Sequence, residues 1–436
     1  MKYLFSIVLM LMVLISCKEN KGKVENQLDS TIELKGKIEG YFSALSKLGK
    51  FNGVIYVTDN DKEIIRKAYN LNAKQASTTY VSTENQFDIH SISKLMACYL
   101  IAKFELEGKI KKTQTIHDFI PDFPNGDKIT IGMLLKHKSG LPRSLEHVEG
   151  NEIALTFDQI IEYAKKQKLL FEPGTASQYS NVGYQIIYYI IADISKKTFA
   201  QCLMDEVFKP LGMKNSGAHF YTQEKNIKNL AKNHEKKDTL IVQVDNVLSD
   251  ELKTARIFST ANDLMKFLNH LKQEPYASLL KNENNIIEKN GGSDGIRTQI
   301  YTNLDYNYNF ILLTNYDEIP FQKTIEDFIK ILENKPYEIP KALNRKPIDL
   351  SIDEMKPFVG TYYFSDMDID LNFKIEHGNL VAYQDGELAA IFKAETENTF
   401  FTDPKEPESF EFIEDGNGNF EVLMGWSGIK LKGVKK

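Results

Sequence analysis

Residues 87–94 have the sequence FDIHSISK, in which the hydroxyl of Ser91 and the amine of Lys94 are three positions apart. Apolar residues recur at helical spacing from Ile92 to Phe104, and Gly108 follows as a left-handed stop, so the sequence predicts a helix that begins near Ser91. Both side chains then lie on one helix face, within reach of each other. Because the first-turn amides of a helix have no intrahelical partners, they favour negative charge close to that serine. The stretch therefore favours a catalytic role, in which Ser91 is a nucleophile and Lys94 takes its proton.

The serine–lysine spacing alone is a weak signal. Ser278 with Lys281 and Ser427 with Lys430 show the same spacing, and each is expected to be a solvated surface pair. What distinguishes Ser91 is that two further boxes follow it along the chain.

The first of these boxes is Tyr179-Ser180-Asn181, immediately before an apolar helical pattern that begins at Val182. The alternative is that Ser180 or Asn181 only caps that helix. Tyr301-Thr302-Asn303 shows that the pattern is common, and this second copy is expected to end a strand.

The second box is Lys289-Asn290-Gly291-Gly292, ahead of a strand-like run at Thr298–Tyr301. Asn-Gly is also the strongest hairpin-turn signal, so a plain turn is the alternative. In a functional interpretation Lys289 offers a fixed positive charge, and the glycines let a backbone edge approach a substrate closely.

Taken in order, the three boxes resemble the Ser-x-x-Lys, Tyr-x-Asn and Lys-Thr-Gly boxes of serine β-lactamases and penicillin-binding proteins. Other stretches look like family landmarks in family order: LLKHKSGLP at 134–142, PLGM at 210–213 and STANDL at 259–264. The likeness runs from about Phe51 to Asn315. The Tyr-x-Asn box makes it similar to class C β-lactamases and related esterases rather than to class A enzymes.

The resemblance implies an α/β (α+β) fold, with an antiparallel sheet flanked by helices and a helical subdomain. It also implies the catalytic roles: Ser91 forms the acyl-enzyme, and Lys94 and Tyr179 relay the proton. For substrate binding it implies that Asn181 orients a substrate amide, that Lys289 binds a carboxylate or favours a Tyr179 phenolate, and that Asn290 and Gly291 complete the box. The backbone amides of Ser91 and Gly292 are then expected to form the oxyanion hole.

The function implied is an exported serine hydrolase that cleaves an ester, an amide or a peptide. Two alternatives stay open: a catalytically silent β-lactam- or peptide-binding or sensor lipoprotein of the same fold, and a true β-lactamase or DD-peptidase.

Three positions depart from the family pattern. His90 replaces the small residue that usually precedes the nucleophile, Asn290 stands where Thr or Ser is usual in β-lactam-recognising members, and Ala255-Arg256 replaces paired glycines. The change at Asn290 weakens the case for antibiotic hydrolysis. His90 and His137 are both expected to be structural rather than catalytic.

The N-terminal residues have the pattern of a signal peptide: Met1-Lys2-Tyr3, an apolar run from Leu4 to Ile15, then Ser16-Cys17 and a polar stretch. Leu14-Ile15-Ser16-Cys17 resembles a bacterial lipobox, so Cys17 is expected to be lipidated and to anchor the protein to a membrane on the periplasmic or cell-surface side. Ordinary secretion is the alternative.

Composition limits the partners. The net charge of −6 is small for 436 residues, and acidic and basic residues are interspersed, so no nucleic-acid partner is expected. The sequence has no metal-ligand spacing or nucleotide motif, so neither a metal nor another cofactor is expected, and the partner besides the membrane is a small-molecule or peptide substrate. Cys98 and Cys202 lie in apolar helical patterns and are predicted to be free thiols.

Composition changes near the C-terminus. Three prolines between Lys335 and Pro347 interrupt regular structure, and short β-branched and aromatic runs follow. The sequence predicts a signal peptide at 1–17, a polar tether at 18–35, a hydrolase domain at 36–335, a linker at 336–347 and a small, barrel-like all-β domain at 348–436, with Trp426 in its core.

Overall fold

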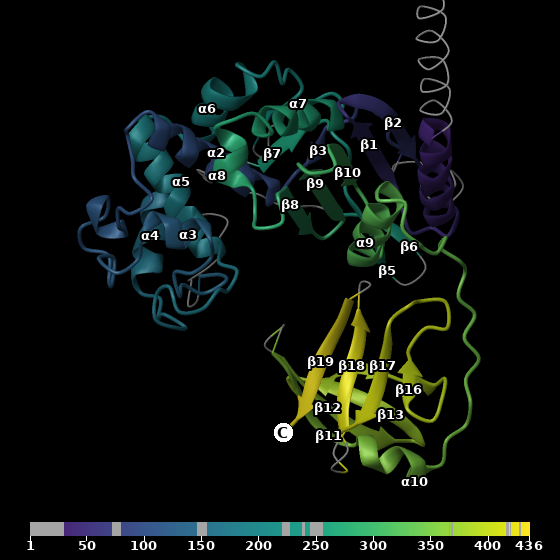
Figure 1. Ribbon diagram of the computed structural model, residues 1–436. Helices are drawn as coiled ribbons and strands as arrows, with labels where there is room; N and C mark the ends of the chain where they lie inside the picture. Colours follow the sequence, from purple (N-terminus) through teal and green to yellow (C-terminus); the bar gives the residue numbers. More distant parts are fainter. Residues whose placement is uncertain are drawn as a thin grey trace, which may run out of the picture. The chain divides into compact units, whose positions relative to one another are not determined.

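The computed structural model describes residues 30–71, 80–145, 155–219, 227–237, 240–244, 256–365, 367, 369–415, 418, 420–426 and 429–436. The chain forms two compact units (Figure 1). The first is Phe51–Glu318, and the second combines residues 30–50 with Ile319–Lys436. The predicted signal peptide, the site of lipidation and most of the tether lie outside the described residues.

The first unit is built on a five-stranded sheet of order β2-β1-β10-β9-β8, with every pair of neighbours antiparallel. Its strands are β1 (Gly53–Asp59), β2 (Lys62–Tyr69), β8 (Ile286–Ser293), β9 (Ile296–Asn303) and β10 (Tyr308–Thr314). Because both faces of β10 are covered, all of its residues are buried and its sequence is a nearly continuous apolar run. Strands β1 and β2 form a hairpin, with Asn60 and Asp61 in the left-handed conformation that such turns require.

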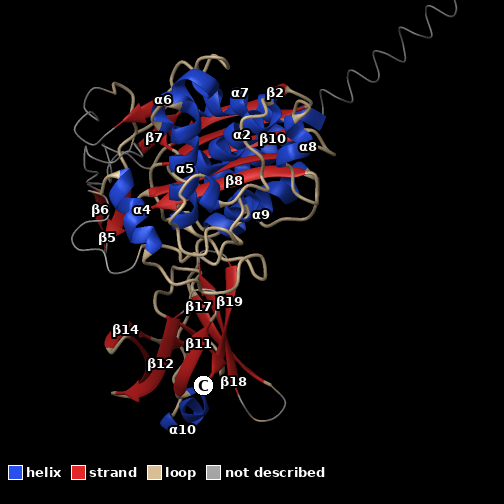
Figure 2. Cartoon of the chain, turned by 90° about the vertical axis from the view of Figure 1, so that its left-hand side faces the viewer, coloured by secondary structure: helices blue, strands red, loops and turns tan. Residues whose placement is uncertain are grey.

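Helices cover one face of this sheet, as Figure 2 shows. Helix α2 (Ile92–Leu106) packs on β8 and β9, and α7 (Ala261–Leu271) packs on β1, β9 and β10. Helix α8 (Tyr276–Leu280) contacts both helices. The arrangement holds one end of α2 against the strand that carries Lys289.

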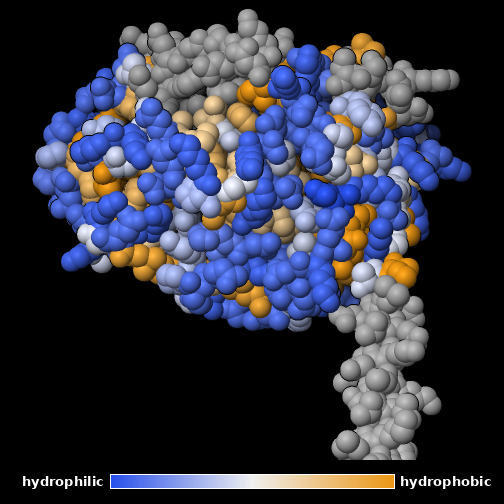
Figure 3. Space-filling model, turned by 90° about the horizontal axis from the view of Figure 1, so that it is seen from above, coloured by the Kyte–Doolittle hydropathy of each residue, from blue (hydrophilic) through white to orange (hydrophobic). Residues whose placement is uncertain are grey.

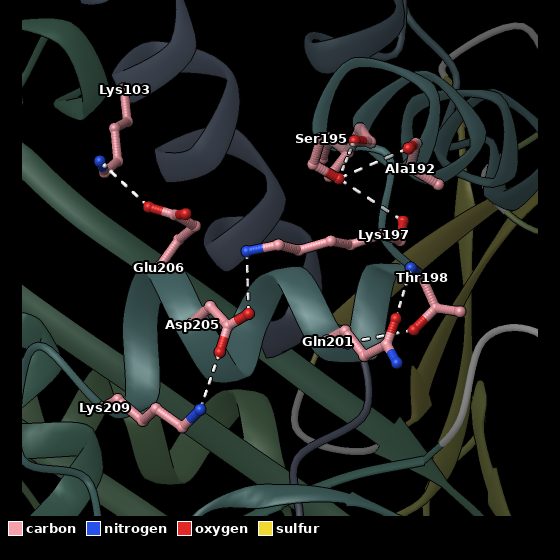
Figure 4. A network of polar contacts seen from close by, with 10 residues as sticks. Lys103, Ala192, Ser195, Lys197, Thr198, Gln201, Asp205, Glu206 and Lys209 are labelled. Atoms are coloured by element: carbon pink, nitrogen blue, oxygen red, sulfur yellow. Dashed lines mark hydrogen bonds and ion pairs between the residues drawn. The ribbon is translucent and has the colours of Figure 1, made fainter.

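A helical part packs on α2 through α5 (Asn181–Ser195). Its other elements are η1 (Ile116–Asp118), α3 (Ile131–Leu135), α4 (Phe157–Lys165), α6 (Phe199–Leu203) and η3 (Met204–Phe208). Serine or threonine side chains cap α3, α4, α5 and α6, as expected for helix starts. Figure 4 shows how ion pairs stabilise one edge: Lys103 of α2 contacts Glu206, and Asp205 lies between Lys197 and Lys209.

A short sheet orients the chain just before the nucleophile candidate. It has the order β3-β7-β4, formed by β3 (Phe87–Asp88), β7 (Arg256–Ser259) and β4 (Gly217–His219). A separate hairpin joins β5 (His234–Lys237) to β6 (Leu240–Gln243). The face drawn in Figure 3 is mostly hydrophilic with scattered apolar patches, in keeping with a large buried core.

The second unit contains a helical pair and an all-β domain. A helix over residues 30–47 packs on α9 (Phe321–Leu332), with the rings of Phe42 and Phe328 5.0 Å apart and a hydrogen bond from Tyr41 to Asp327. After α10 (Ile352–Met355) and η5 (Lys356–Phe358), nine strands form one antiparallel, barrel-like sheet of order β14-β13-β12-β11-β19-β18-β17-β16-β15.

These strands are β11 (Gly360–Phe364), β12 (Ile369–Glu376), β13 (Asn379–Gln384), β14 (Glu387–Ile391), β15 (Lys393–Ala394), β16 (Thr399–Phe401), β17 (Ser409–Glu414), β18 (Phe420–Trp426) and β19 (Ile429–Lys435). Packed aromatic rings, among them Phe358, Phe373 and Phe412, fill the interior. The predicted all-β character of this domain is confirmed. The side chain of Trp426 lies outside the described residues.

The domain boundary at the proline-rich segment stays a prediction. Residues 335–347 have no regular secondary structure and are mostly exposed, which is the condition that favours proteolysis. Limited proteolysis is expected to cut between Lys335 and Lys346 and to release a stable fragment of the β domain. First cleavage within Gly360–Met424 would contradict this boundary.

Candidate active site

The turn between β3 and α2 presents Ser91 at the start of the helix. His90 has φ of 43°, a left-handed conformation that is uncommon outside glycine, and it turns the chain sharply between the strand and the helix. Ser91 is the N-cap of α2, and the amide of Lys94 donates to the Ser91 carbonyl. The serine is therefore fixed by a strand on one side and a helix on the other.

Three predicted residues meet at the Ser91 hydroxyl. Lys94 Nζ donates to Ser91 Oγ at 3.0 Å, and Tyr179 Oη lies 2.8 Å from the same oxygen. Tyr179 reaches this position because it directly precedes α5, whose cap, Ser180, is anchored through its hydroxyl to the carbonyl of Pro142. The cap and the functional interpretations of this box are thus compatible.

Positive charge surrounds the Tyr179 ring. Lys94 Nζ and Lys289 Nζ each lie 5.3 Å from its centroid, and the Arg143 guanidinium carbon lies 5.2 Å from it. Cations this close to an aromatic ring are attracted to its face.

The two lysines are held where an ammonium is costly. Burial, together with the nearby charge of Arg143, lowers the pKa of Lys94 to about 8. Burial also lowers the pKa of Lys289. Lys94 is therefore far easier to deprotonate than an exposed lysine.

His137 supports this arrangement from behind. Its ring is 4.5 Å from that of Tyr179, and its Nδ1 accepts a hydrogen bond from the Ser180 amide. Burial, assisted by the charges of Lys289 and Lys94, lowers the pKa of His137 to about 4, so the ring is neutral. The hydrogen bond agrees with the structural role expected of this histidine. Burial likewise lowers the pKa of His90 to about 4.

The glycine box lies in β8 beside the nucleophile. A Cβ atom at Gly291 would lie 2.4 Å from the Ile89 carbonyl oxygen and 3.0 Å from the Ser91 amide nitrogen, so only glycine allows this approach. Gly292 follows, exposed and paired with Arg297 of β9. The strand edge therefore runs alongside the Ser91 amide, where the oxyanion hole is expected.

Two predicted residues are near the site without touching its centre. Asn181 begins α5, and its backbone amide donates to the Arg143 carbonyl. Asn290 is exposed and, because side chains alternate along a strand, lies on the opposite face of β8 from Lys289. Within the described structure neither amide side chain bonds to Ser91, Lys94 or Tyr179.

The other serine–lysine and Tyr-x-Asn matches lie in the surroundings expected of them, where the structure describes them. Ser278 is exposed and bonds to Glu274, while Lys281 contacts Asn285. Tyr301 to Asn303 end β9. Ser427 and Ala255, and the side chain of Arg256, lie outside the described residues. Cys98 and Cys202 are free.

Sequence reasoning missed two residues of this site. Arg143 follows the LLKHKSGLP landmark directly, and its charge in that position is the only signal the sequence offers. The ring of Tyr184, in α5, lies 5.6 Å from Lys94 Nζ, and its hydroxyl donates to the Leu135 carbonyl.

Among the described residues, no cluster of His, Cys, Asp or Glu side chains could hold a metal ion. In the same part of the chain, no helix is long and apolar enough to cross a membrane.

Comparisons with known proteins identify the family of this chain. The Beta-lactamase family model matches residues 38–300, more than half of the chain. The putative penicillin-binding protein PbpX of Bacillus subtilis is 31% identical over 209 residues, covering 48% of this chain and 50% of that protein. A putative D-alanyl-D-alanine carboxypeptidase of Salmonella agona is 26% identical over 214 residues, covering 45% of each chain.

A solved class C β-lactamase superimposes with a TM-score of 0.59 at 19% identity, over 70% of this chain and 98% of that one. The fold predicted from the sequence is confirmed. The chain belongs to the β-lactamase family. It matches about half the length of these two curated relatives.

Proposed function

We propose that this protein hydrolyses an ester, an amide or a peptide through an acyl-enzyme on Ser91. The observation that carries the proposal is that one hydroxyl, Ser91 Oγ, lies within hydrogen-bond distance of both Lys94 Nζ and Tyr179 Oη. A nucleophile with two proton-transfer groups in contact satisfies the geometric requirement for general base catalysis.

In the proposed reaction the Lys94–Tyr179 pair takes the proton as Ser91 Oγ attacks the substrate carbonyl. The tetrahedral oxyanion is stabilised by the amides of Ser91 and Gly292, the bond to the leaving group then breaks, and Tyr179 returns the proton to that group. Water attacks the resulting ester in a second cycle and frees Ser91. With a pKa of about 8 for Lys94, roughly a tenth of this amine is neutral at pH 7, compared with about one in three thousand for an exposed lysine.

Within this class, the candidate activity is that of a D-alanyl-D-alanine carboxypeptidase, whose substrate is a peptide ending in D-alanyl-D-alanine. It is supported by the name of the Salmonella agona relative and by Lys289, a partly buried cation suited to a terminal carboxylate. Asn290, in place of Thr or Ser, argues against efficient β-lactam hydrolysis.

Intact-mass spectrometry tests the proposal and ranks the alternatives. The protein is exposed in parallel to an activated ester, a peptide ending in D-alanyl-D-alanine and a β-lactam, and both adducts and released products are followed. Turnover of the ester or peptide supports a hydrolase, and rapid β-lactam turnover would instead indicate a β-lactamase. A stable adduct with every compound, without product, would indicate a silent binding protein.

We also propose that the protein is exported and anchored through lipid on Cys17, as the lipobox-like residues suggest. One lipid chain gives only marginal membrane binding, but a diacylated cysteine gives stable attachment. Cys17→Ala is therefore expected to move the protein from the detergent phase to the aqueous phase in a partition experiment. A Cys17→Ala protein that stays in the detergent phase would refute the anchor.

A further inference from the structure

The charge around Tyr179 is unbalanced. Lys94, Lys289 and Arg143 each lie within 5.3 Å of one ring centroid, and among the described residues no carboxylate forms an ion pair with any of the three. Like charges that converge on one ring repel one another, so the cluster favours an anionic ligand among them.

Arg143 is the cation best placed to meet a ligand. Arg143 is exposed, whereas Lys94 is buried and Lys289 is partly buried. No described side chain forms a hydrogen bond or an ion pair with the Arg143 guanidinium. A guanidinium offers five N–H donors in a planar fork that matches a carboxylate. Within the described ranges, which leave out residues 146–154, the Arg143 guanidinium thus makes no hydrogen bond or ion pair and can meet a ligand.

Arg143 is also fixed in position by the site itself. Its carbonyl accepts the Asn181 amide at 2.9 Å, and the carbonyl of the preceding Pro142 accepts the Ser180 hydroxyl at 2.7 Å. These two bonds tie the Arg143 backbone to the Tyr-x-Asn box. A charge on a tethered backbone can discriminate between substrates, because less flexibility is lost on binding.

We infer that Arg143 is a specificity-determining residue that binds an acidic group on the acyl portion of the substrate. The inference rests on the proposed function, in which Lys289 receives a carboxylate on the leaving group and Asn181 orients the substrate amide. Because Arg143 comes from a different loop and is joined to Asn181, it meets a second acidic group, on the part retained by the enzyme. The substrate class is a diacid, with one acidic group on either side of the bond that is cut.

Two matched pairs of chromogenic esters test this assignment. In the acyl pair, mono-p-nitrophenyl glutarate is compared with its methyl ester, which removes only the negative charge. In the leaving-group pair, the butyrate ester of 4-hydroxy-3-nitrobenzoate is compared with the corresponding methyl benzoate. For each pair the quantity of interest is the ratio of kcat/KM between the anionic and the neutral member.

Arg143→Gln is expected to lower this ratio about 10-fold to 100-fold for the acyl pair, the range for a charge-assisted hydrogen bond, and to leave the leaving-group pair unchanged. Arg143→Lys should retain part of the preference. Lys138→Gln is the matched control, since it removes an exposed cation from the same loop and should alter neither ratio.

Three results would overturn the inference: an unchanged ratio for the acyl pair in Arg143→Gln, a change confined to the leaving-group pair, or an equal loss for the charged and neutral members. The last result would show that Arg143 only tunes Lys94.

Calorimetry on Ser91→Ala measures ligand affinity without turnover, because this variant lacks the nucleophile. The glutarate ester should bind about 10-fold to 100-fold more tightly than its methyl ester, and adding Arg143→Gln should abolish the difference. If Ser91→Ala binds the glutarate ester and its methyl ester equally well, the Arg143 assignment is wrong, even if the unaltered protein hydrolyses esters. Conversely, a charge preference in binding without turnover would refute the proposed function alone.

Discussion

Ser91→Ala is expected to abolish covalent labelling by a fluorophosphonate or penicillin reporter and to reduce ester turnover to the background rate. The reason is chemical: the bond to the reporter forms at Ser91 Oγ, and no other described hydroxyl lies between an amine and a phenol in this way. Loss of a nucleophile that works with its base as a unit costs about 10⁶ in kcat in well-studied serine hydrolases. Intact-mass spectrometry and reporter gels measure the two effects.

The controls for this result come from the same chain. Ser93→Ala removes a hydroxyl two residues further along α2, where it contacts Tyr188 instead of the site, and Ser278→Ala removes the exposed alternative. Both should label like the unaltered protein. If Ser91→Ala still labels, or if either control loses labelling while folded, the nucleophile has been assigned to the wrong residue.

The parts of the site that could be predicted share a local cause. Ser91 and Lys94 lie three residues apart on one helix, so their contact follows from helix geometry alone. Tyr179 was singled out because its box follows Ser91 in the order of the family's boxes, and the same box also caps α5. Helix geometry therefore accounts for the Ser91–Lys94 contact, and the resemblance accounts for Tyr179.

The charge cluster could not be predicted in the same way. Arg143, Lys289 and Lys94 come from three separate segments, and their convergence on the Tyr179 ring depends on tertiary packing. The pKa of Lys94 is likewise a product of burial, which a single sequence does not contain. The position of Asn290 on the far face of β8 also required the strand register.

The fold shows a similar division. The hairpin at the start of the first unit and most strands of the β domain follow from period-2 patterns and turn residues. The pairing of β1 with β10 joins residues more than 240 positions apart, and no local pattern specifies it. Helix α9 was not predicted, because its position next to the proline-rich segment obscured its amphipathic pattern.

Tyr179→Phe is expected to reduce kcat/KM by about 10² to 10⁴, the range for one general acid–base group, while the protein stays folded. Removing the phenol oxygen leaves the ring, its tilted contact with the His137 ring and its contacts with the cations, so packing is preserved. Lys94 keeps its bond to Ser91 Oγ and can still act as a base, which is why the loss should be smaller than in Ser91→Ala.

The pH profile separates this catalytic role from a structural one. Burial places the pKa of Lys94 near 8, so its neutral form is lost as the pH falls below that value, and kcat/KM should decline on the acid side. Tyr179→Phe should keep this decline at a lower overall rate, because Lys94 is then the remaining base. Tyr189→Phe makes the same chemical change at a ring that packs near Phe157, and it should leave both rate and profile unaltered. A Tyr179→Phe protein with full activity, or one whose loss is matched by Tyr189→Phe, would exclude the Tyr179 phenol from proton transfer.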